Sequence, residues 1–387
     1  MLAPPLSLYV HLPWCVRKCP YCDFNSHTAG DAAPRARYIA ALLADLDQEA
    51  QRADGRELIS VFLGGGTPSL FAAAEIAQLL DGIRARFALA EQAEITMEAN
   101  PGTVECGDPA GYRQAGVNRL SIGAQSFAAA ALQKLGRIHS VDDITRAVTE
   151  AQAAGFDSIN VDIMYGLPGQ DVAAALADLQ AAIELQPAHI SWYQLTLEPN
   201  TVFHARPPAG LPDNDLGFEI QVAGQAYLLG QGLAQYETSA YARDEALRCR
   251  HNLNYWTFGD YLAVGAGAHG KLSDAGGVRR YQKPANPLKY MECMEKPAPR
   301  AAPAAAPPLA VPDIVFEFML NASRLTGGFN ESLFEQRTGL AADALRPRLE
   351  ACREKGLLEE PGGGFWRASE LGQRFLNDLQ AEFLPAA

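Results

Sequence analysis

The sequence lacks three features that would place the chain in a familiar class. It has no run of 18 apolar residues, so no transmembrane helix is expected. It has no excess of positive charge: 32 Lys and Arg stand against 45 Asp and Glu, and the formal net charge of -13 argues against a general nucleic-acid binder. Its seven cysteines are odd in number and unevenly spaced, which is not typical of a secreted disulfide framework.

The start of the chain, MLAPPLSLYV, has neither a basic segment nor a long apolar stretch, so no signal peptide is expected. Together with the cysteine usage, this predicts a cytoplasmic protein whose thiols stay reduced and can bind metal. Apolar residues make up 48% of the 387 residues and charged residues 20%, as in an ordinary globular protein with a large core.

Short β-rich segments alternate with longer helical segments through the first half of the chain. Such alternation predicts a parallel sheet covered by helices, and six units predict a partial or full barrel. The expected strands span residues 7–13, 58–66, 94–100, 119–126, 158–166 and 189–199. The expected helices span residues 35–52, 73–87, 128–135, 141–154 and 171–185.

Polar and glycine-rich stretches follow the predicted strands at their C-terminal ends. They read CVRKCPYC, GGGTP, EANPG, GAQSF and MYGLPG. Any one of them could simply mark a turn, because glycine and proline are common there. The C-terminal ends of parallel strands, however, meet at one edge of the sheet, so their agreement in position predicts one shared site.

The whole chain is expected to divide into four parts. We predict a barrel core at 1–235, an extension at 236–295 that contains CRHNLNYWTFGDYLAVGAGAHG, an Ala/Pro linker at 296–312 and a small domain at 313–387.

Three helices and a hairpin, followed by a last helix, are expected in the small domain, and this order resembles a winged helix. The domain carries 8 basic and 12 acidic residues, which favours a structural or partner-docking role over DNA binding. The helices are expected at 313–325, 330–338, 342–355 and 370–384, and the hairpin at 357–369.

Three cysteines, Cys15, Cys19 and Cys22, stand within eight residues. A structural zinc site normally needs four ligands, so His11 or His27 would have to supply the fourth. A [4Fe-4S] iron-sulfur cluster usually takes four cysteines, but three on one short loop can hold three irons and leave the fourth iron open. Structural thiols without a metal are a third interpretation.

The C-x3-C-x2-C spacing at the end of a first strand resembles that of the radical SAM enzymes. The wider stretch YVHLPWCVRKCPYCDFNSH, with GGGTPS and HNLNYW, is similar to the HemW heme chaperones, relatives of the oxygen-independent coproporphyrinogen III oxidases. This resemblance covers essentially the whole chain. It implies an α/β fold, a partial (β/α)6-type radical SAM barrel with a small winged-helix-like C-terminal domain. It also implies a [4Fe-4S] cluster on the three cysteines, whose open iron holds S-adenosyl-L-methionine (SAM).

Nine further positions match the family's SAM contacts. Arg137 can bind a carboxylate, because its guanidinium is positively charged and planar. Asp162 lies on an otherwise apolar strand and needs a polar partner, such as ribose hydroxyls. The glycines of LGGGTPS would let backbone amides approach a ligand, and no Gly-Lys-Ser/Thr follows them as in a Walker loop. The implied contacts are Tyr9, Tyr21, Gly65, Gly66, Thr67, Glu98, Gln125, Arg137 and Asp162.

The motif HNLNYW places His251 beside Tyr255 and Trp256, an imidazole next to two rings that could stack on a macrocycle. From spacing alone, a histidine is more often a structural hydrogen-bonding residue. The resemblance implies that His251 binds heme iron. Cys249 and His269 are alternative ligands from the same region.

The resemblance therefore implies a heme chaperone that binds heme and delivers it to apo-hemoproteins, foremost those of the respiratory chain. A homodimer and peripheral contact with a membrane are compatible with this role. One alternative is oxidative decarboxylation of coproporphyrinogen III, and another is a radical SAM reaction on an unrelated substrate. The oxidases carry a further cysteine where this chain has Phe24, and an extension before a first strand that here is expected at about residue 7. Both differences argue against decarboxylation, and we assign no catalytic residue.

Overall fold

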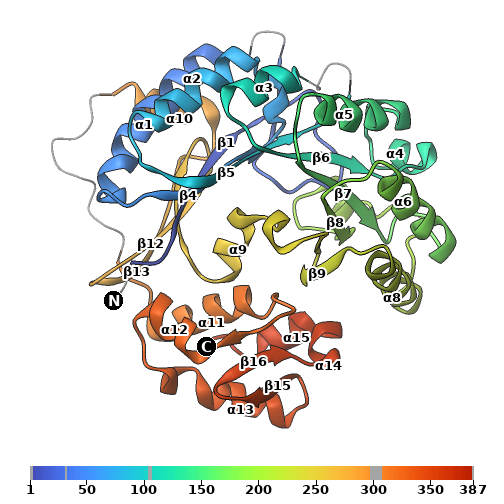
Figure 1. The fold of residues 1–387 in the computed structure, drawn as a ribbon, viewed down its shortest axis with the longest axis vertical. Helices are drawn as coiled ribbons and strands as arrows, with labels where there is room; N and C mark the ends of the chain where they lie inside the picture. The colour runs from blue at the N-terminus through green and yellow to red at the C-terminus, as the bar shows by residue number, and fades with distance from the viewer. Residues whose placement is uncertain (1–2, 31–32, 103–106, 297–306, 386–387) are drawn as a thin grey trace.

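The computed structural model describes residues 3–30, 33–102, 107–296 and 307–385 (Figure 1). Its centre is an 11-stranded sheet of order β13-β12-β11-β1-β4-β5-β6-β7-β8-β10-β9. The main strands are β1 (Leu6–Leu12), β4 (Leu58–Gly65), β5 (Leu89–Ala99), β6 (Arg119–Gln125), β7 (Ser158–Tyr165) and β8 (His189–Gln194). The later strands are β9 (Ala234–Glu237), β10 (Ala240–Ala242), β11 (Asp260–Val264), β12 (His269–Asp274) and β13 (Gly277–Gln282).

The six main strands pair in parallel from β1 to β8, as the alternation of the sequence predicts. Within the described residues, the edge strands β13 and β9 do not pair with each other, so the barrel is partial. All six expected strands and all five expected helices of the first half are confirmed, but β8 ends five residues before the predicted end at 199 and β5 begins five residues before the predicted start at 94.

Helices cover the outer face of the curved sheet (Figure 1). In α5 the buried side chains Ile144, Ala147, Val148 and Ala151 recur at helical spacing, so one stripe faces the strands. The Ser140 side chain accepts a hydrogen bond from the Asp143 amide and marks where α5 begins. The main helices are α1 (Arg35–Ala53), α2 (Ala73–Arg84), α3 (Pro109–Ala115), α4 (Ala129–Lys134), α5 (Val141–Ala153), α6 (Val172–Glu184) and α8 (Asn214–Gly230).

The chain returns to the sheet after α8. Strand β11 pairs in parallel with β1, with Leu6 opposite Asp260, and β12 and β13 extend that edge as antiparallel strands. Helix α9 (Arg250–Trp256) carries the whole HNLNYW motif and packs on β4, β1 and β11. Figure 1 shows α9 between the sheet and the C-terminal domain, so the motif lies inside the mouth of the partial barrel.

The C-terminal domain has its own core around Phe318, Phe334 and Trp366. Its order of helix, short strand, two helices and hairpin is that of a winged helix, as expected. Its elements are α11 (Val311–Ala322), β14 (Phe329–Asn330), α12 (Glu331–Thr338), α13 (Arg346–Glu354), β15 (Leu358–Gly362), β16 (Phe365–Ala368), α14 (Glu370–Arg374) and α15 (Leu376–Ala381). The single last helix predicted at 370–384 is wrong, because the helix is interrupted at Phe375 and forms two short helices. Most of the predicted Ala/Pro linker at 296–312 lies outside the described residues.

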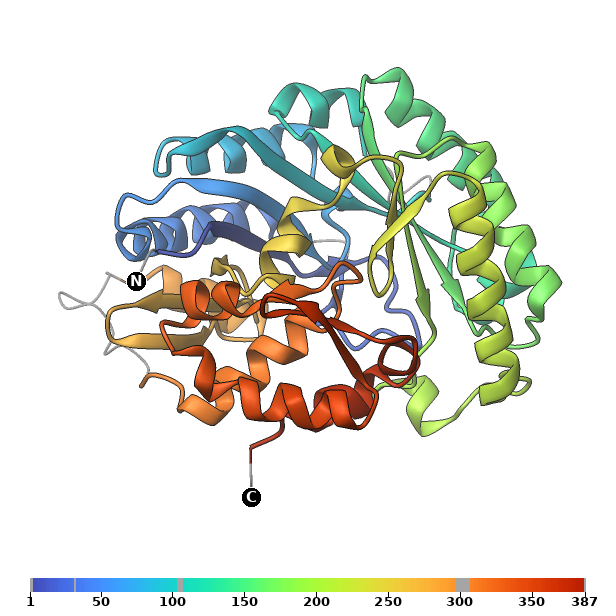
Figure 2. The same ribbon diagram turned by 60° about the horizontal axis from the view of Figure 1, so that its bottom comes forward.

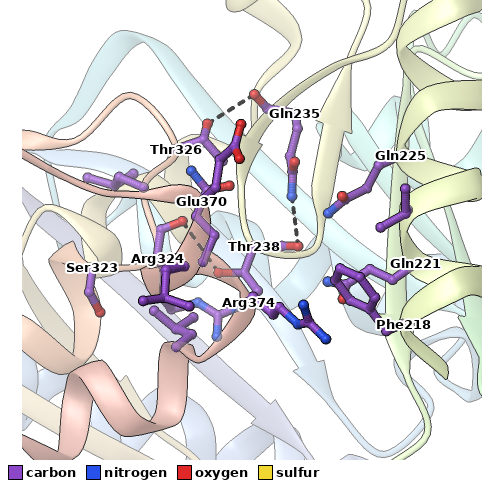
Figure 3. Close-up of a pocket in the computed structure, with 15 residues that line it drawn as sticks. Phe218, Gln221, Gln225, Gln235, Thr238, Ser323, Arg324, Thr326, Glu370 and Arg374 are labelled. Atoms are coloured by element: carbon purple, nitrogen blue, oxygen red, sulfur yellow. Dashed lines mark hydrogen bonds between the residues drawn. The ribbon is translucent and has the colours of Figure 1, made fainter. Parts of the chain in front are cut away.

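The C-terminal domain lies against the open side of the barrel (Figure 2). Arg324 donates to Glu237 Oε2 at 2.9 Å, and the Thr326 amide donates to the Tyr236 carbonyl at 3.2 Å. A cavity of about 610 Å³ remains between α8 and the domain, where Arg374 lies 3.9 Å above the Phe218 ring (Figure 3). At the opposite sheet edge, Arg280 of β13 pairs with Glu317 at 2.6 Å, and Phe258 and Val278 belong to the same hydrophobic core as Phe318. Polar and apolar contacts at both edges of the sheet therefore hold the domain beside the barrel.

In the part of the chain that the structure describes, none of the helices combines the length and apolar character needed to cross a bilayer.

Candidate functional site

The loop after β1 brings the three cysteines to one cavity of about 480 Å³. A hydrogen bond joins the two ends of the loop: the His27 amide donates to the Pro13 carbonyl at 2.7 Å. Cys15 is buried, Cys19 and Cys22 are partly buried, and none of the three forms a disulfide with another described cysteine. Among the described residues, no three His, Cys, Asp or Glu side chains converge closely enough to hold a single metal ion.

Arg137 lies beside the cysteine loop. Its guanidinium donates to Asn100 Oδ1 at 2.6 Å and to the Gly123 carbonyl at 3.0 Å. A third contact, from Nη1 to Cys19 Sγ at 3.5 Å, joins it to the loop itself. Positive charge is therefore held next to a thiol that would have to ionise to bind metal.

The glycine-rich loop after β4 packs closely against the start of the cysteine loop. A Cβ on Gly66 would lie 2.6 Å from the Trp14 carbonyl oxygen, and the φ of 114° at Gly65 also requires glycine. The amides of Gly65, Gly66 and Thr67 donate to Glu98, Leu12 and Trp14. The protein thus uses all three amides itself, which corrects the expectation that they approach a ligand; SAM would meet this loop through other atoms.

Two carboxyl groups, Glu98 on β5 and Asp162 on β7, line the same cavity. Removal from solvent, and then the nearby Asp162 charge, raises the pKa of Glu98 to about 7, although the hydrogen bond from the Gly65 amide acts in the opposite direction. Removal from solvent also raises the pKa of Asp162, which accepts from Ser121 at 2.9 Å and Asn160 at 2.8 Å. Both groups suit a ligand with cationic or hydroxyl donors.

Gln125 ends β6 with a φ of 71°, a left-handed conformation that is uncommon for residues with a side chain. The following turn is held by Asp178, which accepts from Ser126 Oγ at 3.0 Å and from the Phe127 amide at 2.7 Å. The Tyr193 hydroxyl donates to Gln125 Oε1 at 2.7 Å. The surrounding contacts therefore hold a strained residue at the cavity wall.

A second cavity of about 760 Å³ adjoins the first on the side of α9. Aromatic residues and histidines line it, among them Tyr9, His251, Tyr255, Trp256 and His269. The two cavities share the lining residues Phe24, Phe62, Gly65, Glu98, Asn252 and Trp256.

His251 is buried in the wall of this second cavity, with its ring stacked on Phe62 at 4.9 Å. Its Nδ1 lies 3.0 Å from Ser60 Oγ, which itself donates to Ser7. Ser60 must therefore accept from Nδ1–H, and the lone pair of Nε2 faces the Tyr255 hydroxyl at 3.1 Å. Burial, and then the Arg119 charge, lowers the pKa of His251 to about 3, so the ring is neutral near pH 7.

The other two candidate ligands occupy different surroundings. Cys249 is buried and its Sγ lies 3.5 Å from Glu94 Oε1. Burial raises the pKa of this thiol to about 12, so it does not ionise near neutral pH. His269, at the start of β12, is exposed on the wall of the second cavity.

The structure thus divides the predicted contacts between the two cavities. Tyr9 and His251 line only the second, and Gly65 and Glu98 line both. The remaining predicted SAM and cluster residues line the first: Cys15, Cys19, Cys22, Tyr21, Gly66, Thr67, Gln125, Arg137 and Asp162.

Several polar residues of the first cavity were missed from the sequence. Asn100 could have been identified, because it is the last residue of the predicted strand at 94–100; its Nδ2 donates to Thr67 Oγ1 at 3.0 Å. The others sit inside strands with no local signal: Ser121, Asn160, Ser191 and Tyr193.

Comparison with known proteins agrees with this geometry. Residues 9–181 match the model of the Radical SAM superfamily, and residues 309–375 match that of the HemN C-terminal domain. The chain is 48% identical to the heme chaperone HemW of Escherichia coli (strain K12) and 46% identical to that of Haemophilus influenzae, over 98% of each chain. Coproporphyrinogen III oxidase (HemN) from Escherichia coli, a radical SAM enzyme, shares the fold with a TM-score of 0.80 at 24% identity, over 98% of this chain and 90% of that one.

Proposed function

The chain belongs to the HemW family within the radical SAM superfamily, and from that premise we propose that it is a heme chaperone that delivers heme to apoproteins, foremost respiratory hemoproteins. One observation carries the proposal. A cavity with three cysteines and SAM-type polar groups shares a wall with a larger cavity that has an aromatic and histidine lining.

The residues of the first cavity fit a [4Fe-4S] cluster with SAM. Cys15, Cys19 and Cys22 line this cavity and form no disulfide with another described cysteine, and Arg137 beside them can hold a carboxylate. Glu98 can accept from an ammonium group, and Asp162 from ribose hydroxyls. When bound, a cluster with SAM supplies one-electron chemistry. On the proposed function, this site regulates heme transfer or dimerisation of the protein.

The second cavity fits heme. Its volume of about 760 Å³ lies within the range of roughly 300–1,000 Å³ that small-molecule and cofactor sites span. His251 is the proposed iron ligand, because its neutral ring directs the Nε2 lone pair to the cavity side and its Nδ1–H is held by Ser60. Iron would replace the Tyr255 hydroxyl at Nε2, so re-formation of the hydrogen bond between His251 and Tyr255 favours release, which suits a carrier that must give up its cargo.

Decarboxylation of coproporphyrinogen III is the competing function, and Phe24 argues against it. The Phe24 side chain is 60% exposed and lies at the junction of the two cavities. A phenyl ring there offers apolar contact and neither a thiolate nor a proton, in contrast to the cysteine that the resemblance to the oxidases implies for this position.

The test uses anaerobically reconstituted protein with SAM present. Titration with heme should give a saturable Soret band at one heme per chain. Incubation with coproporphyrinogen III should release no protoporphyrinogen. Conversion of coproporphyrinogen III without saturable heme binding would refute the chaperone function and support the oxidase function.

A further inference from the structure

Arg119, the first residue of β6, is a buried cation on the wall of the first cavity. Its side chain is only 3% exposed, and its Nε is buried without a hydrogen-bond partner. Among the contacts of the described residues, Arg119 makes no side-chain hydrogen bond or ion pair. A buried charge without a partner is costly, so its surroundings need an explanation.

The carboxylates nearest to Arg119 in the structure are engaged by other donors. Glu94 accepts from the amides of Arg250 and His251 at 2.9 and 3.1 Å. Asp162 accepts from Ser121 and Asn160, as described above. These acids offset the charge of Arg119 at a distance, but neither forms a direct bond with its guanidinium.

Two further donors lie in the wall of the same cavity, where the Arg324 guanidinium lies 4.3 Å over the Trp256 ring. Trp256 Nε1 and Arg324 Nε are also buried without partners, and both residues line the first cavity. Arg324 otherwise pairs with Glu237 at 2.9 Å, which occupies that carboxylate. Unpaired N–H donors, two of them cationic, are complementary to an anionic group with strong acceptor atoms.

Arg119 lies away from the cysteine loop. Arg119 begins β6 and Gln125 ends it, so the two lie on the order of 20 Å apart along the strand. Arg137, at the Gln125 end, already supplies a cation for the methionyl carboxylate of SAM. Trp256, by contrast, lines both the first cavity, which it shares with Arg119, and the proposed heme cavity.

We propose that Arg119, with the indole N–H of Trp256, binds a propionate carboxylate of the heme whose ring occupies the second cavity. The inference rests on the proposed heme-binding function and specifies how the cargo is oriented. A propionate bound by a buried guanidinium gives the carrier a preference for porphyrins with free carboxylates.

The experiment compares iron protoporphyrin IX with its dimethyl ester by Soret titration of reconstituted full-length protein. Wild-type protein should bind the free acid roughly tenfold or more tightly than the ester, because the ester cannot form the charge-assisted bond. Arg119→Gln should lose that preference through weaker binding of the free acid alone. Arg119→Lys should keep part of it, and the exposed Arg353→Gln should change nothing. SAM affinity, measured by equilibrium dialysis, should be the same in all four proteins.

Three results would overturn the inference while heme binding itself stands. The wild type could bind acid and ester equally, a result that needs no variant to fold. Arg119→Gln could weaken acid and ester by the same factor, which would indicate a structural role. It could also weaken SAM binding, which would assign the guanidinium to SAM. A wild type that binds neither porphyrin would instead overturn the proposed chaperone function.

Discussion

The Gly65 amide donates to Glu98 Oε2 at 3.0 Å, and both residues line the two cavities at once. A strand end and a glycine loop therefore form one wall with two faces. Since either ligand would touch this wall, the arrangement connects the proposed SAM site with the proposed heme site through direct contact, without a long chain of intermediate residues.

The cysteine loop provides the first prediction. Replacing Cys15, Cys19 or Cys22 by Ala should abolish the brown chromophore after anaerobic reconstitution, because each thiolate would hold one iron. Cys293→Ala, at an exposed cysteine on α10 (Pro287–Met294), is the matched control and should reconstitute normally. Iron and sulfide analysis checks the outcome; stoichiometric zinc without sulfide would refute it.

SAM binding should depend on pH through Glu98. Its pKa is raised to about 7, so the group is neutral below that pH and a carboxylate above it. Because SAM is cationic at its sulfonium and ammonium groups, its affinity should rise severalfold between pH 6 and 8. Glu98→Gln should bind SAM weakly and lose this rise. A pH profile that is identical in Glu98→Gln and wild type would show that another group titrates.

Asp178 should matter for both stability and SAM. Its carboxylate accepts from Ser126, the Phe127 amide and Gln170, and it holds the turn that follows the strained Gln125. Asp178→Ala leaves buried donors unpaired, at a cost of about 1–3 kcal/mol in the free energy of unfolding. Thermal melting should show a lower Tm and equilibrium dialysis a weaker SAM affinity, whereas the exposed Asp142→Ala should change neither.

Heme ligation should be visible in the spectra of single variants. His251→Ala should shift the Soret band and change the spin state, because the imidazole ligand is lost. Cys249→Ala and His269→Ala are the comparisons and should leave the spectrum unchanged. If the spectrum of His251→Ala superimposes on that of the wild type, the assignment fails, and a shift in either comparison would identify the ligand.

Tyr255 competes with iron for His251 Nε2 on this account. Tyr255→Phe keeps the aromatic ring and removes the hydroxyl that lies 3.1 Å from that nitrogen. Heme affinity should therefore rise by roughly 2- to 10-fold, which corresponds to the net free energy of one ordinary hydrogen bond. Weaker heme binding with an unchanged Soret band would contradict the proposed exchange at Nε2.

Much of the fold was predictable because its signals are local. The alternation of apolar strands and amphipathic helices depends on near neighbours in the chain, and so does the turn chemistry at strand ends. The pairing of β11 with β1 was not predictable in this way, because Leu6 and Asp260 are brought together by tertiary packing alone.

The same difference between local signals and tertiary packing decides which residues of the candidate site were predictable. The cysteine spacing and the glycine loop are short motifs, so their positions could be read from the sequence. Tyr9 was expected at SAM but lines the second cavity, since its side chain direction depends on how β1 packs beside α9. Arg119 and Tyr193 carried no signal at all: a charged or aromatic residue in a strand gains its role only from the residues across the barrel.

The most direct test of the account is transfer of heme from this protein to an apoprotein. Heme-loaded protein is mixed with an apocytochrome of the respiratory type, and formation of the holocytochrome spectrum is followed against free heme at the same concentration. The carrier should lose heme and the apocytochrome should gain the same amount, faster or more completely than from free heme, and the transfer should be impaired in His251→Ala. Retention of heme by the carrier, or a gain no greater than that from free heme, would contradict it.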